Sequence, residues 1–213
     1  MATLLLTLRA ALKEAGDPLR APKMQAYMKS AMPFHGVPAP ARRSLTRKLF
    51  AGRSWPDADA FAAEVRALWK GATFREERYA AVQLTGHRAA KALQGPALLP
   101  LYEELIVSGA WWDYVDELAA HRVGPLLLAH PGVVRPAMLS WSRSSDLWKR
   151  RTAILCQLRF KAKTDLSCST PPSSRRSARR SSSCARRSAG RCASTPRPIR
   201  RRCAATSRST AHG

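Results

Sequence analysis

The sequence predicts an all-α protein: a HEAT-like helical-repeat solenoid of stacked antiparallel helix pairs, followed by a disordered C-terminal tail rich in Arg and Ser. Three observations support this prediction. Apolar residues recur at spacings of three and four through residues 1–163, and no stretch alternates apolar and polar residues long enough for a convincing strand. The helical stretches arrive in pairs about every 35 to 40 residues. The composition then changes abruptly after residue 163.

Six stretches with helical spacing are separated by clusters of Gly and Pro. The helical stretches are residues 3–16, 59–69, 77–90, 97–107, 115–130 and 147–160. The clusters that interrupt them are residues 16–22, 32–40, 52–59, 95–100 and 130–134. Two helix starts are also marked by capping residues. Pro56 with Asp57 and Asp59 opens one helix, and the Ser-Ser-Asp sequence at residues 144–146 opens another.

The formal net charge of +23 is unevenly distributed along the 213 residues. Residues 1–163 hold 25 Lys and Arg against 13 Asp and Glu, whereas residues 164–213 hold 12 Arg, no Lys and one acid, Asp165. Such a positive excess indicates a polyanionic partner. We therefore expect two regions, a folded domain over residues 1–163 and a basic tail over residues 164–213.

Several classes of protein are excluded by what the sequence lacks. No apolar stretch approaches the ~20 residues that span a bilayer. The apolar run at the N-terminus is interrupted by Arg9 and Lys13 and follows no basic residue, so it does not resemble a signal peptide. Cys156 stands alone in residues 1–163, and the five scattered His give no zinc-binding spacing. We therefore expect a cytoplasmic protein with no metal site.

Two basic clusters fall in different predicted helix pairs. The first is Arg42, Arg43, Arg47 and Lys48, and the second is Lys149, Arg150, Arg151, Arg159, Lys161 and Lys163. A solvated helix face is the ordinary explanation for such clusters. Because two of them occur with aromatic residues nearby, the pattern favours a groove that binds phosphates.

The sequence GAWWDYVDEL at residues 109–118 places two tryptophans directly before a group of carboxylates. Helical spacing puts Trp112, Asp116 and Ala119 on one stripe, and Trp111, Val115 and Leu118 on the next. We predict that Trp111 belongs to the core, whereas Trp112 and Asp116 form a pair that faces the groove. The alternative is that an aspartate in the first turn only interacts favourably with the helix dipole.

The residues around this block resemble the AlkD-type DNA glycosylases, a HEAT-like-repeat family that excises alkylated purines. Residues 104–131 and 145–163 carry the resemblance, and residues 27–45 are similar to the family's N-terminal signature of "YMK", "PF-G" and "P-RR". The resemblance covers residues 3–163. It implies a monomeric, nucleoid-associated enzyme of base excision repair, which needs no cofactor or metal and acts on alkylated purines in double-stranded DNA.

The resemblance also implies roles for individual residues. It makes Asp116, Trp112 and Arg151 the catalytic set. The carboxylate and the indole face would stabilise positive charge on the deoxyribose as the glycosidic bond breaks, and the guanidinium would hold a backbone phosphate. Tyr27 matches an aromatic residue that lies near the DNA in the family. The remaining expected DNA-binding residues are Arg42, Arg43, Lys149, Arg150, Arg159 and Lys161.

The tail, residues 164–213, has two interpretations. It is either a disordered Arg/Ser arm that binds nucleic acid, or a GC-rich coding sequence translated out of frame. Regrouping codons over residues 167–195 permits two amphipathic helices similar to the family's next helix pair, which favours a frameshift near Leu166. The helical stack would then be incomplete, and some of the residues Trp148, Ile154, Leu155 and Leu158 should be unusually exposed.

Other functions remain open at the level of sequence. The chain could be a non-catalytic HEAT-like scaffold that grips DNA or RNA through its basic groove. A carboxylate that faces phosphates, as expected for Asp116, would have no use in such a protein. The chain could also be an RNA-binding or packaging protein that acts through the tail, or an inactive truncated product of a repair gene.

Overall fold

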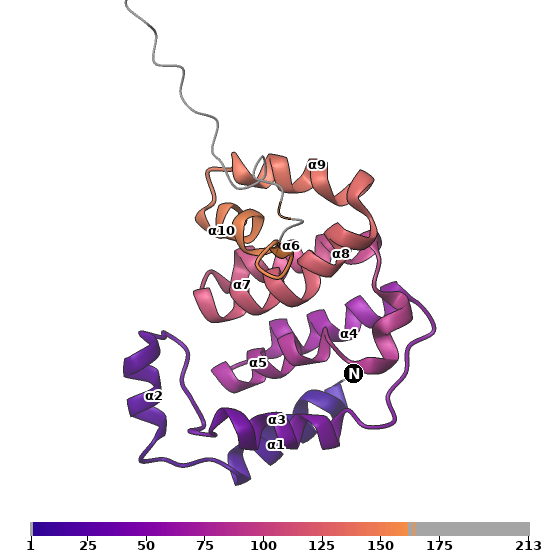
Figure 1. Cartoon of the computed structure of the whole chain (residues 1–213). Helices are drawn as coiled ribbons and strands as arrows, with labels where there is room; N and C mark the ends of the chain where they lie inside the picture. The colour runs from indigo at the N-terminus through magenta and orange to yellow at the C-terminus, as the bar shows by residue number, and fades with distance from the viewer. Residues whose placement is uncertain (1, 162–163, 165–213) are drawn as a thin grey trace, which may run out of the picture. The chain divides into compact units, whose positions relative to one another are not determined.

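Ten α-helices and three short helical turns make up the computed structural model, which describes residues 2–161 and 164 (Figure 1). The α-helices are α1 (Ala2–Glu14), α2 (Ala21–Met28), α3 (Ala39–Leu49), α4 (Ala58–Gly71), α5 (Arg75–Leu84), α6 (Leu99–Gly109), α7 (Trp112–Leu118), α8 (Gly124–Ala129), α9 (Pro131–Ser142) and α10 (Leu147–Leu155). The short turns are the 3₁₀ helices η1 (Arg88–Leu93) and η2 (Pro96–Leu98) and the π turn η3 (Ala119–Val123). The described residues contain no strand, so the all-α prediction is confirmed for them.

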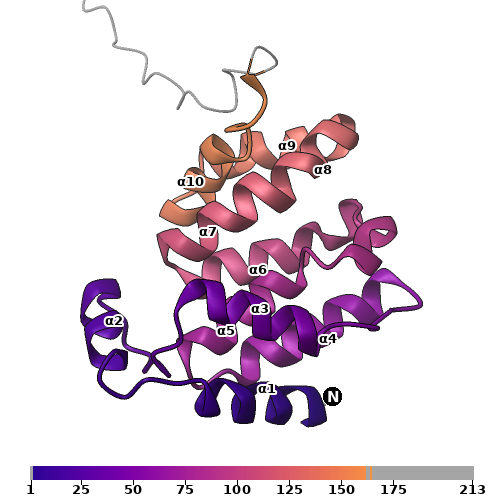
Figure 2. The same ribbon diagram turned by 60° about the horizontal axis from the view of Figure 1, so that its bottom comes forward.

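Helix packing builds two layers from successive helix pairs (Figures 1 and 2). Helix α1 packs on α3, α4 on α5, α6 on α7, and α9 on α10. Along one layer α3 contacts α5, α5 contacts α7, and α7 contacts α10, while α1 contacts α4 and α4 contacts α6 along the other. Helix α2 lies to one side of the stack in both views. The layer of α3, α5, α7 and α10 carries the catalytic residues expected from the sequence.

The space between the layers is filled by the apolar stripes of the helices. Typical contributors are Leu8 and Leu12 of α1, Phe61 and Leu68 of α4, and Leu105 of α6, all of which are buried. Full burial of an aliphatic or aromatic side chain contributes about 1.5–3 kcal/mol to stability. This core therefore fixes the relative positions of the helices that bear the candidate site. Within the described residues, no helix has both the length and the hydropathy needed to cross a bilayer.

Both helix starts that the sequence marks are confirmed. Asp57 accepts a hydrogen bond of 2.7 Å from the backbone N–H of Ala60 at the start of α4. Asp146 accepts hydrogen bonds of 2.8 Å from the backbone N–H groups of Trp148 and Lys149 at the start of α10. Such caps satisfy N–H groups that have no partner within the helix.

Several helix boundaries differ from those expected, among them the following three. Helix α5 ends at Leu84 rather than near residue 90, because the hydroxyl of Thr85 donates to the carbonyl of Val82 and the chain turns into η1. Residues 130–134 were expected to interrupt the helices, but α9 already begins at Pro131. Proline is tolerated in this first turn, because an N–H at that position has no partner within the helix. Helix α10 ends at Leu155, five residues earlier than the apolar spacing predicts.

The loop between α2 and α3 is held by a buried carboxylate of α5. Glu76 accepts hydrogen bonds of 3.0, 2.9 and 3.2 Å from the backbone N–H groups of His35, Gly36 and Val37. Gly36 has a φ of 87°, and a Cβ there would lie 2.1 Å from the carbonyl oxygen of Asp17. Only glycine suits this turn, which is the "PF-G" element of the sequence.

The adjacent carboxylate, Glu77, joins α5 to α1. It is fully buried and pairs with Arg9 at 2.7 Å, and it accepts hydrogen bonds from the backbone N–H groups of Thr73 and Phe74. Burial acts to raise the pKa of Glu77, but these hydrogen bonds outweigh burial, so the pKa lies below its usual value. Glu77 is therefore held as a carboxylate in the interior.

Candidate active site

The two adjacent tryptophans lie at the turn between α6 and α7. Ala110 adopts a left-handed conformation with φ and ψ of 43°, which costs a non-glycine residue about 1–2 kcal/mol. Trp111 follows in an extended conformation as the residue before the helix, and it packs partly buried against the core. Trp112 begins α7 and is 45% exposed. The core role predicted for Trp111 is confirmed, but the expectation that Trp111 belongs to the helix is wrong.

The first aspartate after the tryptophans points into the protein. Asp113 accepts a hydrogen bond of 2.9 Å from Nη2 of Arg75 and one of 2.5 Å from the hydroxyl of Tyr79. Burial, and then the hydrogen bond to Asp113, raises the pKa of the Tyr79 hydroxyl above its usual range. Arg75 also donates to the Tyr79 oxygen at 2.9 Å and lies over the ring of Tyr114. This buried cluster fixes the start of α7 against α5.

The second aspartate, Asp116, faces outward and pairs with Arg151 of α10. Nε and Nη2 of Arg151 donate to Oδ1 and Oδ2 of Asp116 at 2.6 and 2.7 Å, which is a two-point ion pair. The hydrogen bonds to Asp116 raise the pKa of Arg151. Ala119 does not share this open face as expected, because α10 packs across η3 and Ala119 is buried.

A cavity of about 480 Å³ lies beside this ion pair. It is lined by Trp112, Ser142, Leu147, Trp148, Arg150, Arg151, Ile154 and Leu155. Its walls are thus mostly apolar, with two guanidinium groups among them. Ile154 and Leu158 are 50% and 69% exposed, so the expectation of unusual exposure near the end of the described chain is confirmed for them. Trp148 and Leu155 are only partly exposed, and Leu158 lies beyond the end of α10.

Three of the basic residues expected to bind DNA are already engaged within the protein. Arg42 stacks on the ring of Tyr79 at 4.1 Å, and burial lowers its pKa. Lys149 pairs with Glu103 of α6. Arg150 donates two hydrogen bonds of 2.7 Å to backbone carbonyls of the loop before α10. These interactions place the side chains but also occupy some of their donors.

The other residues of that set face solvent from separate elements. Tyr27 of α2 is 81% exposed, and Arg43 of α3 is also exposed. Arg159 and Lys161 follow α10, and Arg159 lies within 3.1 Å of Nδ1 of His121. The structure therefore brings Asp116 and Arg151 together beside Trp112, whereas the exposed basic residues are spread over α3 and the segment after α10.

Two residues next to the site are not among the candidates predicted from the sequence. Arg75 and Tyr79 of α5 hold Asp113; Arg75 is buried and Tyr79 is partly buried. Asp113 lies 38 residues from Arg75 and 34 from Tyr79 in sequence. The sequence feature that could have indicated this cluster is helical periodicity, which would turn the faces that carry all three residues toward the core.

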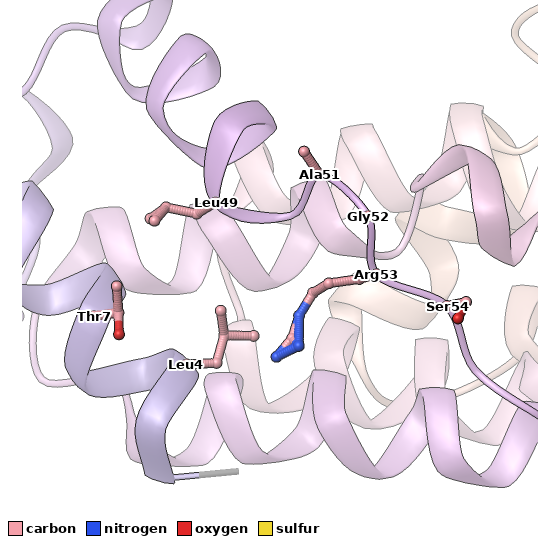
Figure 3. A pocket seen from close by; sticks show the side chains of 7 residues that line it. All are labelled: Leu4, Thr7, Leu49, Ala51, Gly52, Arg53 and Ser54. Carbon is pink, nitrogen blue, oxygen red and sulfur yellow. The ribbon is translucent and has the colours of Figure 1, made fainter.

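Other parts of the described structure offer less chemistry. No group of three or more His, Cys, Asp or Glu among the described residues is placed to hold a metal ion. A hollow of about 560 Å³ lies between the start of α1 and the loop after α3 (Figure 3). Its one charged lining residue, Arg53, is bound to Glu64 at 2.8 Å. This hollow therefore lacks a free acid or base.

Comparison with known proteins agrees with the helix-pair architecture and identifies the family. The sequence model of a family described as DNA alkylation repair enzyme matches residues 8–170, and the chain therefore belongs to that family. Its structure is similar to that of a predicted DNA alkylation repair enzyme from Enterococcus faecalis, with 28% sequence identity and a TM-score of 0.63. The similarity covers 72% of this chain and 70% of the other. No curated protein matches the chain significantly. Membership of this family indicates a role in the repair of alkylated DNA, with DNA as the substrate.

Proposed function

We propose that this protein is an alkylpurine-DNA glycosylase, which hydrolyses the N-glycosidic bond of cationic N3- or N7-alkylated purines in double-stranded DNA. The observation that carries the proposal is the two-point ion pair between Asp116 and Arg151 beside the exposed Trp112. A repair enzyme that breaks this bond needs a fixed negative charge near the sugar and a positive charge near the phosphate. The pair offers both within one contact.

The chemistry requires no strong acid, because alkylation at N3 or N7 makes the purine a cationic leaving group. The bond between C1′ and the purine nitrogen breaks, and its electron pair leaves with the base. Positive charge develops on the deoxyribose, where Asp116 stabilises it electrostatically. A water molecule oriented by Asp116 then forms the new bond to C1′, and its proton passes to the carboxylate and to solvent.

Trp112 and Arg151 act on either side of the carboxylate in this proposal. The exposed indole of Trp112 supports the cationic sugar by a cation–π interaction. Arg151 uses two of the five N–H donors of its guanidinium to bind Asp116, and in this proposal the remaining donors bind a backbone phosphate. The ion pair would thereby align the phosphate and the sugar of the damaged nucleotide.

The test is release of free 7-methylguanine from a methylated duplex. Asp116→Asn should lower the single-turnover rate at least about tenfold, which corresponds to more than about 1.4 kcal/mol of transition-state stabilisation. Affinity for DNA should hold or rise, because a negative charge near phosphates is removed. Asp59→Asn, at an exposed position of α4, is the matched control and should change neither quantity. An unchanged rate for Asp116→Asn would contradict the catalytic role.

A second candidate, a DNA-binding protein without glycosylase activity, is favoured by one observation. Leu147 and Ile154 border the cavity and are 58% and 50% exposed, as in a site that lacks one wall. The two candidates differ in the release assay but not in binding. A protein that binds the methylated duplex and releases no base, even after the reading frame beyond residue 166 is restored, would support the second candidate.

A further inference from the structure

The helix that carries Asp116 continues past Leu118 through the π turn η3 into α8. A π turn inserts an extra residue into a helix and occurs frequently at functional sites. Here it contains His121 and Arg122, neither of which contributes to the site described above. Both residues line a hollow together with residues of the segment that follows α5.

Arg122 is held in a fixed position by this segment. Its Nε donates to the hydroxyl oxygen of Thr85 at 2.8 Å, and its Nη1 donates to the carbonyl of His121 at 2.7 Å. Thr85 is fully buried and directs its own hydrogen to the carbonyl of Val82, so its oxygen is free to accept. A Cβ on Gly86 would lie 2.0 Å from Nη2 of Arg122. The absence of a side chain at residue 86 therefore makes room for the guanidinium.

This guanidinium forms one wall of a hollow of about 220 Å³. Five basic side chains line it: His87, Arg88, Lys91, His121 and Arg122. Its lining residues include no Asp or Glu. Glu117 lies outside this lining, with its Oε1 3.6 Å from Nη2 of Arg122 and its Oε2 3.8 Å from Nε2 of His121, on a side chain that is 45% exposed. Burial lowers the pKa of Arg122, so an anionic partner would relieve an unfavourable burial of charge.

We propose that this hollow binds a phosphate group of the DNA backbone, with Arg122 as the fixed ligand and the exposed Arg88 and Lys91 as further ligands. A phosphate suits it because a guanidinium presents parallel N–H donors that match phosphate oxygens. Arg122 follows Asp116 by six residues, or about 9 Å along a helix. The choice of DNA as the source of the phosphate rests on the proposed function, whereas the inference that the hollow binds an anion is independent of that function.

The alternative source is a free phosphate ion, and the experiment has an arm for each. In the first arm, the full chain is titrated with an undamaged, labelled duplex at several salt concentrations. Arg122→Gln should weaken binding about five- to tenfold near 0.1 M salt and reduce the slope of log affinity against log salt by about one. Arg88→Gln should weaken binding about two- to fivefold. Lys13→Gln on α1 removes the same charge at an exposed position and should change affinity less than twofold.

Gly86→Ala separates a built site from general electrostatic attraction. It leaves the net charge unchanged and needs no unusual backbone conformation, but its Cβ displaces the guanidinium of Arg122. It should therefore weaken binding at least about threefold while circular dichroism stays unchanged. Gly86→Ala also tests the site if Arg122→Gln fails to fold because it lacks the hydrogen bond to Thr85. If Gly86→Ala and Arg88→Gln both behave like Lys13→Gln, the proposal is overturned.

In the second arm, inorganic phosphate is added while the NMR signal of the Arg122 Nε–H is followed. A shift of this signal by both phosphate and duplex supports the DNA site. A shift by phosphate alone, with duplex affinity insensitive to Gly86→Ala, overturns the assignment to DNA in favour of a free anion. Both arms use binding to undamaged DNA or to phosphate, so a failure of the glycosylase proposal in the base-release assay would not affect them.

Discussion

Arg151 holds Asp116 by two parallel hydrogen bonds of 2.6 and 2.7 Å and in doing so joins α10 to α7. The two side chains are 40% and 38% exposed, so water and salt screen the pair. An exposed ion pair of this kind contributes only about 0–1 kcal/mol to stability. Its main consequence is geometric, because two contacts fix the plane of the carboxylate where one contact would let it rotate.

The first prediction separates the charge of Arg151 from its two-point hydrogen bonding with Asp116. Arg151→Lys keeps the charge but loses the two-point contact with Asp116. We expect Arg151→Lys to bind DNA within about twofold of the parent while its excision rate falls several-fold. Arg151→Ala should lose both excision and affinity, with a salt slope smaller by about one. The measurement is single-turnover base release together with a salt titration of binding, and equal excision by the parent and Arg151→Lys would contradict the geometric role.

The second prediction concerns the buried contact between Asp113 and Tyr79. Tyr79→Phe leaves one oxygen of Asp113 without its hydrogen-bond donor in the interior. The free energy of unfolding, measured in urea, should fall by about 1–3 kcal/mol. Tyr27→Phe removes the same hydroxyl from a side chain that is 81% exposed and should change stability by less than about 0.5 kcal/mol. Similar losses in the two variants would show that the buried contact is not stabilising.

The third prediction follows from the lowered pKa of Glu77. Its ordinary pKa is 4.5 and its folded pKa lies below this value, so the ionised carboxylate favours the folded state. That contribution is fully present above about pH 4.5 and is lost as the pH falls through the folded pKa. Glu77→Gln should therefore destabilise the protein at pH 7 and flatten the decline of the melting temperature as the pH falls below about 4.5. A parallel pH profile for parent and variant would contradict the lowered pKa.

Local signals made part of this fold predictable from the sequence. Asp57 and Asp146 cap helices through N–H groups two or three residues away, and such contacts depend on short-range geometry alone. The spacing that placed Asp116 and Trp112 on an open face also depends on one helix. These features could be expected without knowledge of the tertiary structure.

Contacts between distant residues could not be predicted in this way. Glu76 is fully buried and binds the backbone near His35, 41 residues earlier, a contact that no pattern in the sequence indicates. Ala119 is buried in the π turn, which contacts α10 and α6 as well as the helices on either side of it. The pairing of Asp116 with Arg151 likewise required α7 and α10 to be neighbours. Each of these depends on which helices meet, and helical periodicity does not determine that.

The last prediction concerns the reading frame beyond Leu166, a segment that lies outside the described residues. We propose that a frameshift there replaces a further helix pair, because Leu147, Ile154 and Leu158 expose apolar surface at 58%, 50% and 69%. Restoring the frame should bury these side chains, raise the melting temperature by several degrees and increase base release in the same variant. Both effects have one cause, since the surface that is covered also borders the cavity beside Asp116.

The matched variant for this prediction is truncation after Lys163. It removes 12 Arg and one Asp, a net charge of +11, but little apolar sequence. We expect the melting temperature to change by less than about 2 °C and the affinity for undamaged DNA to fall, with a shallower salt dependence. Resequencing the gene across codon 166 shows whether the shift is present in the DNA. If truncation unfolds the protein, or if the restored frame changes neither stability nor base release, the present sequence of residues 164–213 is the functional one and the frameshift proposal is wrong.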